Sequence, residues 1–270
     1  MKIKCSVEVL TLNSARTLRR CLESLRNFDD VIVLDGNSTD ETLSIAQEFG
    51  ARILQQSDST TPNARITDFS AVRNKGLSAA AHRWFLFIDS DEYLSPEAAE
   101  EIRLIVGRGK KNTTYVYKMP RKYIVENRII EHSAMYPNYQ IRFFSLDAVH
   151  EFIKPVHEKI KIREGYTVGF MEHPEYVPFE DWRILKHKWA NYAQLQVAGN
   201  TFSPLSLTRF TVDNFLVFVK YLVKYALTFT QGSGLRMPFL YEWHNAYYHM
   251  RLIAKAWKSF FATMWYSQKQ

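Results

Sequence analysis

Three carboxylates follow a short apolar segment in the first half of the chain. Residues 84–88 are all aromatic or aliphatic, and Asp89, Asp91 and Glu92 come soon after them. An apolar run of this length is typical of a strand buried on both faces, and the carboxyl end of such a strand borders the ligand in open α/β sheets. If the backbone turns there, Asp89 and Asp91 can reach one divalent cation, which prefers oxygen ligands and suits a diphosphate. The alternative is an ordinary solvated Asp-x-Asp turn.

Asp35 and Arg73 are further candidates for ligand contacts. Asp35 directly follows a second apolar segment, residues 31–34. A carboxylate in that place can accept the N–H of a uracil- or guanine-like base, whereas adenine offers mainly its amino group. Arg73 precedes the aromatic strand, where its guanidinium can contact a phosphate or a base. The alternatives are that Asp35 only begins a turn before Gly36 and that Arg73 is a solvated helix residue.

The segments around these residues predict an α/β fold, with a mostly parallel sheet and helices on both faces. Strands are expected at residues 3–10, 31–34, 51–54 and 84–88, and helices at about 14–25, 38–49, 69–81 and 95–106. Their alternation indicates right-handed crossovers. Ser38 and Glu41 fit a capping box for the second helix, and Ser95 with Pro96 marks the start of the fourth. Later segments predict strands at 115–119 and 139–144 and a helix at 179–197.

Positive charge is concentrated in the last quarter of the chain. The protein has 270 residues, a hydrophobic fraction of 46% and a formal net charge of +7. Residues 205–270 contain eight Lys and Arg but two acidic residues, whereas residues 1–204 contain 27 basic and 26 acidic ones. We therefore predict a main α/β domain at 1–204 and a basic helical tail at 205–270.

The tail contains two amphipathic stripes rich in aromatic residues. The first stripe is Phe215, Phe218, Val219, Leu222 and Val223, and the second is Ile253, Ala256, Trp257, Phe260, Phe261 and Met264. Basic helices of this kind suit the headgroup level of an anionic membrane. The alternative is packing on the rest of the chain or on a second copy of it. The apolar stretch 215–219 ends at Lys220, far short of a membrane span, and we expect neither a span nor a signal peptide.

Four segments resemble the family 2 glycosyltransferases in their order and approximate spacing. They are residues 10–13, 31–42, 73–76 and 87–92. Later segments are similar to the branch of that family which builds lipopolysaccharide cores, and these are residues 139–144, 156–158, 246–248 and 254–257. The resemblance implies a GT-A fold, a nucleotide-sugar donor, and transfer with inversion at the anomeric carbon. It makes residues 1–204 a catalytic domain.

The resemblance also implies roles for individual residues. Those matching the family's nucleotide site are Thr11, Asn13, Asp35 and Arg73, and those matching its metal–diphosphate motif are Asp89 and Asp91. Among them, Asp35 would accept a hydrogen bond from the base. The chain departs from the family at Ser14, where an acidic residue is frequent, and at Leu34, where a second aspartate often precedes Asp35. Both departures concern donor contacts more than the class of reaction.

Transfer of a sugar needs a cation and a base. A divalent cation, Mg²⁺ or Mn²⁺, would neutralise the leaving diphosphate as a Lewis acid. A carboxylate or imidazole would take the proton of the attacking hydroxyl. Our candidate base is Glu158, for which the alternative is an exposed Glu paired with a nearby lysine. Other candidate carboxylates are Glu92, Glu180 and Asp181, and the residues assigned to acceptor or diphosphate binding are Gln140, Arg142 and His157.

The main functional hypothesis is an inverting, metal-dependent glycosyltransferase of cell-envelope glycan synthesis. It would act in the cytoplasm at the inner face of the cell membrane, on a saccharide or lipid-linked acceptor, and it could form homo-oligomers. One alternative is a phosphatase of the haloacid dehalogenase type, although that family usually carries Asp-x-Asp on its first strand. Another is a degenerate transferase that serves as a membrane-bound scaffold. A dehydrogenase is disfavoured because no G-x-G-x-x-G follows the first strand, and no base-reading module suggests a nucleic acid partner.

Overall fold

The chain forms two compact units. The computed structural model describes residues 1–109, 112–155, 159–197 and 200–267. The first unit comprises Met1–Lys122 and Pro137–Pro178, and the second comprises Tyr123–Tyr136 and Phe179–Gln270. The boundary expected at residue 204 thus lies inside the second unit, which contains one helix more than the predicted tail and a short segment from the middle of the chain.

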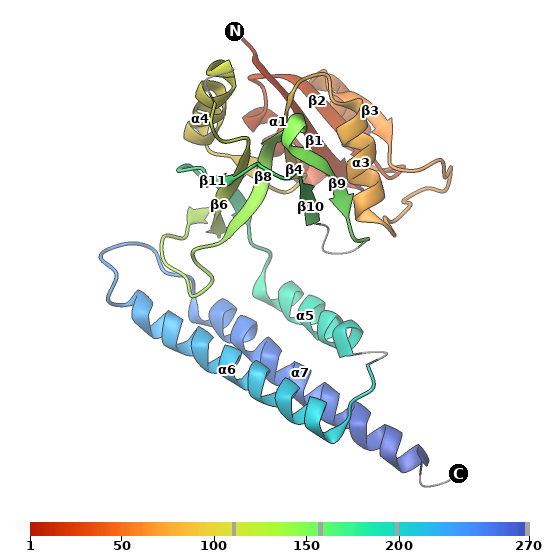
Figure 1. Ribbon diagram of the computed structural model, residues 1–270, viewed down its shortest axis with the longest axis vertical. Coiled ribbons are helices and arrows are strands. Elements are labelled where there is room, and N and C mark those ends of the chain that lie inside the picture. The colour runs from red at the N-terminus through yellow and green to blue at the C-terminus, as the bar shows by residue number, and fades with distance from the viewer. Residues whose placement is uncertain (110–111, 156–158, 198–199, 268–270) are drawn as a thin grey trace. The chain divides into compact units, whose positions relative to one another are not determined.

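A mostly parallel sheet forms the centre of the first unit (Figure 1). Its parallel strands are β1 (Ile3–Thr11), β2 (Phe28–Asp35), β3 (Arg52–Gln55) and β4 (Trp84–Asp89), in the spatial order β3-β2-β1-β4. Strand β8 (Tyr139–Ser145) continues the sheet antiparallel to β4, and β6 (Val116–Val125) is antiparallel to β8. The α/β class and the strands expected from the apolar segments are confirmed.

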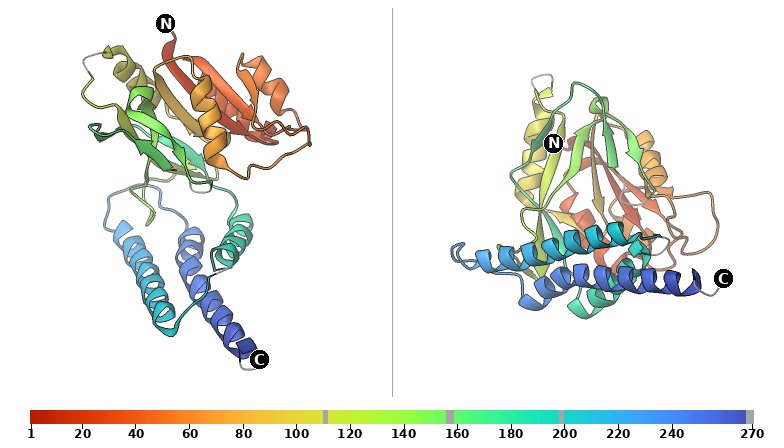
Figure 2. Two further views of the ribbon diagram at one scale, coloured as in Figure 1. Left: turned by 45° about the vertical axis from the view of Figure 1, so that its right-hand side comes forward. Right: turned by 60° about the horizontal axis from the view of Figure 1, so that its bottom comes forward.

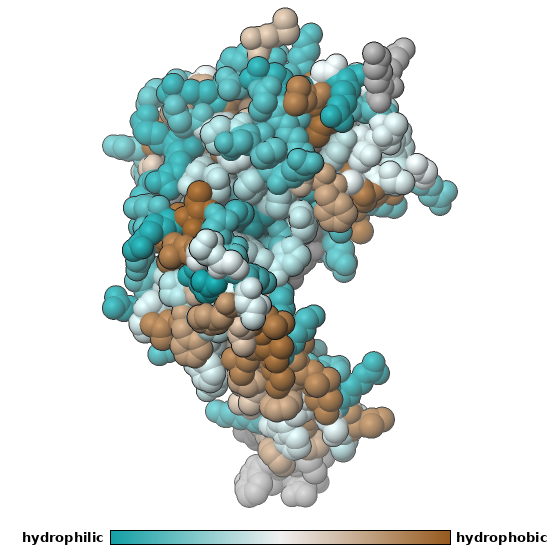
Figure 3. Space-filling model, turned by 90° about the vertical axis from the view of Figure 1, so that its left-hand side faces the viewer, coloured by the Kyte–Doolittle hydropathy of each residue, from teal (hydrophilic) through white to brown (hydrophobic). Residues whose placement is uncertain are grey.

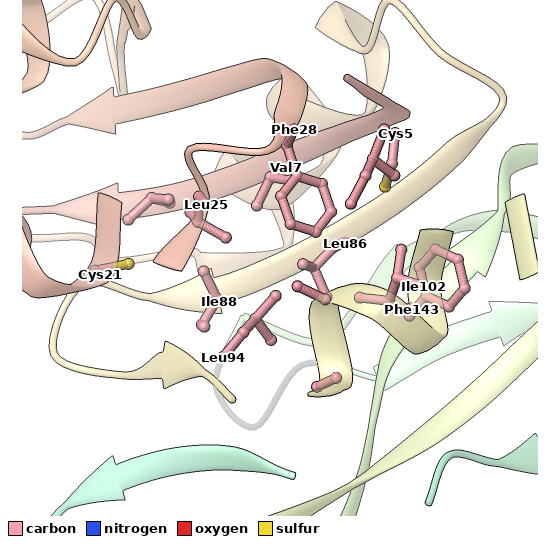
Figure 4. Packing of buried hydrophobic residues seen from close by; sticks show 14 of the residues in the cluster. Cys5, Val7, Cys21, Leu25, Phe28, Leu86, Ile88, Leu94, Ile102 and Phe143 are labelled. Carbon is pink, nitrogen blue, oxygen red and sulfur yellow. The ribbon is translucent and has the colours of Figure 1, made fainter. Parts of the chain in front are cut away.

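Helices cover both faces of this sheet. Helices α1 (Ala15–Ser24), α2 (Thr42–Glu48) and α4 (Pro96–Gly107) contribute to one core with β1 and β4, whereas α3 (Phe69–Ala79) packs Val72 against the opposite face. Figure 4 shows the first core, where Cys5, Val7, Cys21, Leu86 and Ile102 are among the labelled side chains. Cys5 and Cys21 are buried free thiols. Each face therefore buries one set of alternating strand residues.

The two predicted helix starts have different outcomes. The Ser95 hydroxyl accepts a hydrogen bond from Ala98 N, and Pro96 begins α4, so that prediction is confirmed. The capping box at Ser38 and Glu41 is wrong, because α2 begins only at Thr42 and has no side-chain cap. The physical reason is that other partners already use the Ser38 hydroxyl: its Oγ accepts a hydrogen bond from Asn13 N at 2.8 Å and donates to the Asp35 carboxylate at 2.6 Å.

Short strands complete the first unit. Strands β9 (Val149–Ile153) and β10 (Lys159–Ile162) form a separate antiparallel pair that follows the 3-10 turn η2 (Leu146–Ala148). Strand β11 (Val168–Phe170) pairs with β6, and β5 (Tyr93–Leu94) pairs with β12 (Glu175–Pro178). Strand β9 of this hairpin lies beside α3 (Figure 1).

Three helices make up most of the second unit. They are α5 (Trp182–Val197), α6 (Pro204–Thr228) and α7 (Phe239–Ser267), and α6 and α7 run side by side in Figures 1 and 2. Val197, Leu207 and Leu252 come from different helices and share one buried cluster. The segment 123–136, with β7 (Arg128–Ile129), joins them through Glu242, whose carboxylate accepts hydrogen bonds from Ser133 Oγ and Ala134 N, both at 2.7 Å.

Candidate active site

The backbone turns directly after β4. Glu92 N donates to Asp89 O at 2.9 Å, which closes a turn over residues 89–92. In the parallel register, Leu10 lies opposite Asp89, and Thr11 lies opposite Asp35. The carboxyl ends of three neighbouring strands therefore bring Thr11, Asp35 and Asp89 to one edge of the sheet. This is the edge at which ligands bind in open α/β sheets.

Two guanidinium groups hold the Asp89 carboxylate. Arg73 Nη2 lies 2.6 Å from Oδ1, and Arg142 Nη2 lies 3.2 Å from Oδ2. Burial alone would raise the pKa of Asp89, but the positive charges of Arg142 and Arg73 outweigh it and hold that pKa well below its usual range. Asp89 is therefore ionised and fixed in one orientation.

Arg73 also pairs with a carboxylate from β1. Its Nη1 lies 2.8 Å from Glu8 Oε1. A Cβ atom at position 76 would lie 1.8 Å from Glu8 Oε2, so only glycine leaves room for that carboxylate beside α3. Arg73 and Gly76, which belong to the motif at residues 73–76, thus share one buried neighbour, Glu8, which is not among the predicted site residues. Its only sequence signal is a carboxylate inside the apolar run of β1.

Arg142 connects Asp89 to two more buried carboxylates. It lies 2.7 Å from Glu92 and 3.0 Å from Glu175, and Arg121 also pairs with both of these residues. The resulting charge cluster contains the guanidinium groups of Arg73, Arg121 and Arg142 and the carboxylates of Glu8, Asp89, Glu92 and Glu175.

The charge cluster carries one more carboxylate than guanidinium groups. Burial raises the pKa of Glu92 to about 8, and its neighbours Glu175 and Asp89 add to this, whereas Arg142 opposes it. Because Glu92 is buried and bound by Arg121 and Arg142, its geometry suits the support of Asp89 rather than contact with an acceptor hydroxyl. Arg121 and Glu175 do not lie in any sequence motif that would have identified them as site residues.

Asp89 borders two pockets. One, here called the Thr11 pocket, measures about 370 Å³ and has apolar walls that include Ile66 and Phe69. The other, the Gln140 pocket, measures about 660 Å³. Its lining comes from β4, β6, β8, β9 and β10 and includes Phe87, Asp89, Arg121, Tyr139, Gln140, Arg142, Phe152 and Lys159. The predicted pair Gln140 and Arg142 therefore shares one pocket.

The predicted nucleotide residues are joined by hydrogen bonds. The fully buried Asp35 carboxylate accepts from Thr11 Oγ1 at 2.9 Å and from Ser38 N at 2.8 Å, in addition to the Ser38 hydroxyl. Asn13 accepts from Thr39 N at 2.9 Å and donates to Asn63 Oδ1 at 2.9 Å. These contacts fix the loops after β1 and β2. The contact between Asp35 and a base stays a prediction.

The candidate bases occupy different parts of the chain. His157 and Glu158 lie outside the described residues. Glu180 and Asp181 belong to the second unit, where Asp181 accepts a hydrogen bond from Arg183 N at 2.8 Å at the start of α5. Their assignments stay predictions.

Asp91, on the turn after β4, has a carboxylate of the kind that binds a hard divalent cation. In the described part of the chain, no three His, Cys, Asp or Glu side chains are grouped as a metal site. Both oxygens of Asp89 face guanidinium groups. Asp91 is exposed and lies on the turn that follows Asp89. Mg²⁺ is commonly bound by one or two carboxylates together with substrate phosphates. Asp91 and a donor diphosphate could supply such a set of oxygen ligands.

Comparisons with known proteins agree with the motifs. A protein of Synechococcus elongatus described as a TPR repeat-containing protein is 39% identical over 99 residues, which cover 36% of this chain and 23% of that protein. An uncharacterized glycosyltransferase of Rickettsia felis is 30% identical over 117 residues, covering 43% of this chain and 38% of the relative. The chain thus matches less than half the length of these relatives.

Similar solved structures include TarS of S. aureus in complex with UDP-GlcNAc, with 14% identity, a TM-score of 0.48, and coverage of 94% of this chain and 89% of that one. Glucosyl-3-phosphoglycerate synthase from Mycobacterium tuberculosis, solved with Mn²⁺, UDP and glucosyl-3-phosphoglycerate, gives 21% identity, a TM-score of 0.38, and coverage of 54% and 58%. The family model described as "Glycosyl transferase family 2" matches residues 6–152, which contain all four motifs and the cluster residues Glu8, Arg73, Asp89 and Arg142. The chain belongs to glycosyl transferase family 2.

Proposed function

We propose that the protein transfers a sugar from a nucleotide-sugar to an acceptor hydroxyl, with inversion at the anomeric carbon. The observation that carries this proposal is the position of Asp89, which borders both the Thr11 pocket and the Gln140 pocket. A transferase must hold its donor and its acceptor on either side of the reacting bond. Two adjoining pockets that share one fixed carboxylate suit this requirement.

In this proposal the Thr11 pocket receives the nucleoside. Its apolar side chains, among them Leu10, Ile66 and Phe69, offer surfaces on which a base can pack, and Arg65 adds a positive charge. The diphosphate would then extend toward the turn at residues 89–92. There Asp91 would hold Mg²⁺ or Mn²⁺, which would supply Lewis-acid neutralisation of the leaving diphosphate.

The Gln140 pocket would receive the transferred sugar and the acceptor. Gln140 and Lys159 offer polar groups to sugar hydroxyls, and Tyr139, with 41% of its surface exposed, offers an aromatic face. Arg142 would act through Asp89, because its guanidinium is already bound by carboxylates. We keep Glu158 as the proposed base, on the strength of its match to the family branch.

We further propose a saccharide or lipid-linked acceptor of the lipopolysaccharide core type. This rests on the resemblance of residues 139–144 and 156–158 to that branch of the family. It would place the enzyme in the cytoplasm, at the inner face of the cell membrane.

The second unit supports contact with a membrane surface. Apolar side chains gather over its helices on the face shown in Figure 3. On α6 the exposed ones are Leu205, Val212, Phe215, Leu216, Val219, Val223 and Leu227. Phe239, Trp243 and Tyr247 form a row of neighbouring rings on α7, with centroids 6.0 and 5.8 Å apart. Aromatic and basic side chains together favour the headgroup region of anionic lipid. None of the described helices has the length and apolar character needed to cross a bilayer.

Nucleotide-sugar turnover tests this proposal. The purified protein should release nucleoside diphosphate from at least one sugar nucleotide in a panel of UDP-, GDP- and CMP-sugars when acceptor glycans and Mn²⁺ or Mg²⁺ are present. Release of phosphate from simple phosphomonoesters would instead support the phosphatase alternative. No turnover, with retained binding to vesicles, would support the scaffold alternative and overturn the proposed activity.

A further inference from the structure

Asn74 makes two hydrogen bonds with the backbone of a single residue. Its Nδ2 donates to Phe152 O at 2.9 Å, and Phe152 N donates to its Oδ1 at 2.7 Å. An Asn side chain offers an acceptor and donors in one plane. Asn74 therefore pairs with β9 as a neighbouring strand would, although it lies on α3.

The β9–β10 hairpin has few other backbone links. Its two strands form a sheet of their own and share no backbone ladder with the main sheet in the described residues. An isolated two-stranded hairpin is marginally stable, so its position depends on contacts with other elements. Phe69 N donates to Pro155 O at 2.9 Å, so a third hydrogen bond joins α3 to this part of the chain, just after β9.

The hairpin supplies one side of the Gln140 pocket. Phe152, Lys159 and Ile160 belong to that lining, together with Asp89 and Arg142 from the main sheet. The Phe152 ring is buried, and its centroid lies 5.1 Å from that of Phe87 in an edge-to-face arrangement. A shift of β9 would therefore change the shape of the pocket beside Asp89.

Consecutive residues of α3 thus hold two parts of one pocket. Arg73 binds Asp89, and Asn74 binds Phe152. We propose that Asn74 is a positioning residue for sugar transfer: it holds the β9–β10 hairpin at the distance from Asp89 that the acceptor requires. This inference rests on the proposed function, because it takes the Gln140 pocket as the acceptor site.

Two variants and one control test the proposal. Asn74→Ala removes both hydrogen bonds, and Asn74→Asp keeps an acceptor for Phe152 N but loses the donor to Phe152 O. Lys75→Ala is the control, since Lys75 is the next residue and its side chain is exposed. Hydrogen exchange should be about tenfold faster or more across residues 149–153 in Asn74→Ala, because its local opening costs less free energy. Exchange in β1 and β4 should not change.

Activity separates a positioning role from a purely structural one. With octyl glycosides as acceptors, Asn74→Ala and Asn74→Asp should lower kcat/KM for the acceptor by about tenfold or more, while the calorimetric affinity for UDP or GDP with Mn²⁺ stays within about twofold. Unchanged exchange at 149–153 would overturn the proposal, and so would faster exchange with unchanged transfer, or an equal loss of nucleotide affinity. If the wild type turns over no nucleotide-sugar, the proposed function fails, and the role of Asn74 in sugar transfer fails with it. The hydrogen-exchange data then still decide whether Asn74 holds the hairpin.

Discussion

Arg73 and Glu8 form an ion pair that is almost completely buried. Arg73 Nη1 lies 2.8 Å from Glu8 Oε1, and the two side chains are 2% and 0% exposed. Glu8 comes from the first strand and Arg73 from the third helix, so the pair joins two elements beneath Asp89. Because a buried charge without a partner is costly, each of these residues depends on the other for its place in the core.

Glu8→Gln should destabilise the protein by about 3 kcal/mol or more, the range for removing one partner of a buried ion pair. Arg73 would keep Asp89 as a partner but lose its second carboxylate. Chemical denaturation of the purified variant measures the change in the free energy of unfolding. The matched control is Glu48→Gln, since Glu48 lies 2.7 Å from Arg19 but both side chains are more than half exposed. An exposed pair contributes far less, so an equal loss in both variants would contradict the prediction.

Asp91→Asn should abolish transfer while leaving the fold intact. The amide keeps the shape of the side chain but lacks the negative charge that a hard cation requires. Nucleoside diphosphate affinity should fall only when Mn²⁺ or Mg²⁺ is present, as titration calorimetry with and without metal can measure. Wild-type turnover by this variant at limiting metal would remove Asp91 from the metal site.

The parts of the site that sequence reasoning found are local in the chain. The apolar run before Asp89 and the turn after it follow from neighbouring residue types, and both are present. Glu8 and Glu175 were missed because their guanidinium partners lie far away in sequence, and a single carboxylate in a strand does not reveal its partner. The predicted capping box failed for the same kind of reason, because the Ser38 oxygen accepts a hydrogen bond from the backbone of Asn13, which lies far from it in sequence.

The tail shows the same limit of pattern reasoning. Of the stripe predicted on α7, Ala256 is buried and Phe260 packs beside it, whereas Trp257 and Phe261 are 37% and 58% exposed. Helical spacing defines a face but does not reveal which part of it another helix will cover. Similarly, Lys224 donates to Tyr136 O at 2.8 Å, a contact that net charge could not predict.

Glu158→Gln should lower turnover by about a hundredfold or more, the range for loss of a general base. Donor affinity should change little, because the base would face the acceptor and not the nucleotide. Steady-state kinetics at saturating donor, with nucleotide affinity measured separately, checks both statements. Asp181→Asn is the comparison variant: a nearly wild-type Glu158→Gln enzyme with an inactive Asp181→Asn enzyme would transfer the assignment to Asp181.

The tail's basic residues should bring the second unit to anionic lipid, but only some of them are suitable for a test. Lys224, Arg251 and Lys255 donate hydrogen bonds to other residues of this unit, so replacing them would disturb its packing. Lys220 and Lys258 are exposed. Each basic residue near an anionic surface contributes about 1 kcal/mol, so changing both to Gln should weaken vesicle binding about 30-fold.

Co-sedimentation with vesicles of anionic and of neutral lipid, at low and high salt, measures this effect. The control is the double change Lys4→Gln and Lys75→Gln, which removes the same charge from exposed positions of the first unit. Binding of the wild type and of this control should be similar, should require anionic lipid, and should weaken with salt because ions screen exposed charges. Activity on a soluble acceptor should survive in Lys220→Gln/Lys258→Gln, whereas activity on a membrane-embedded acceptor should fall. An equal loss of vesicle binding in the two double variants would assign the binding to net charge alone. If the wild type binds no vesicles, the exposed face of α6 would instead serve packing or self-association.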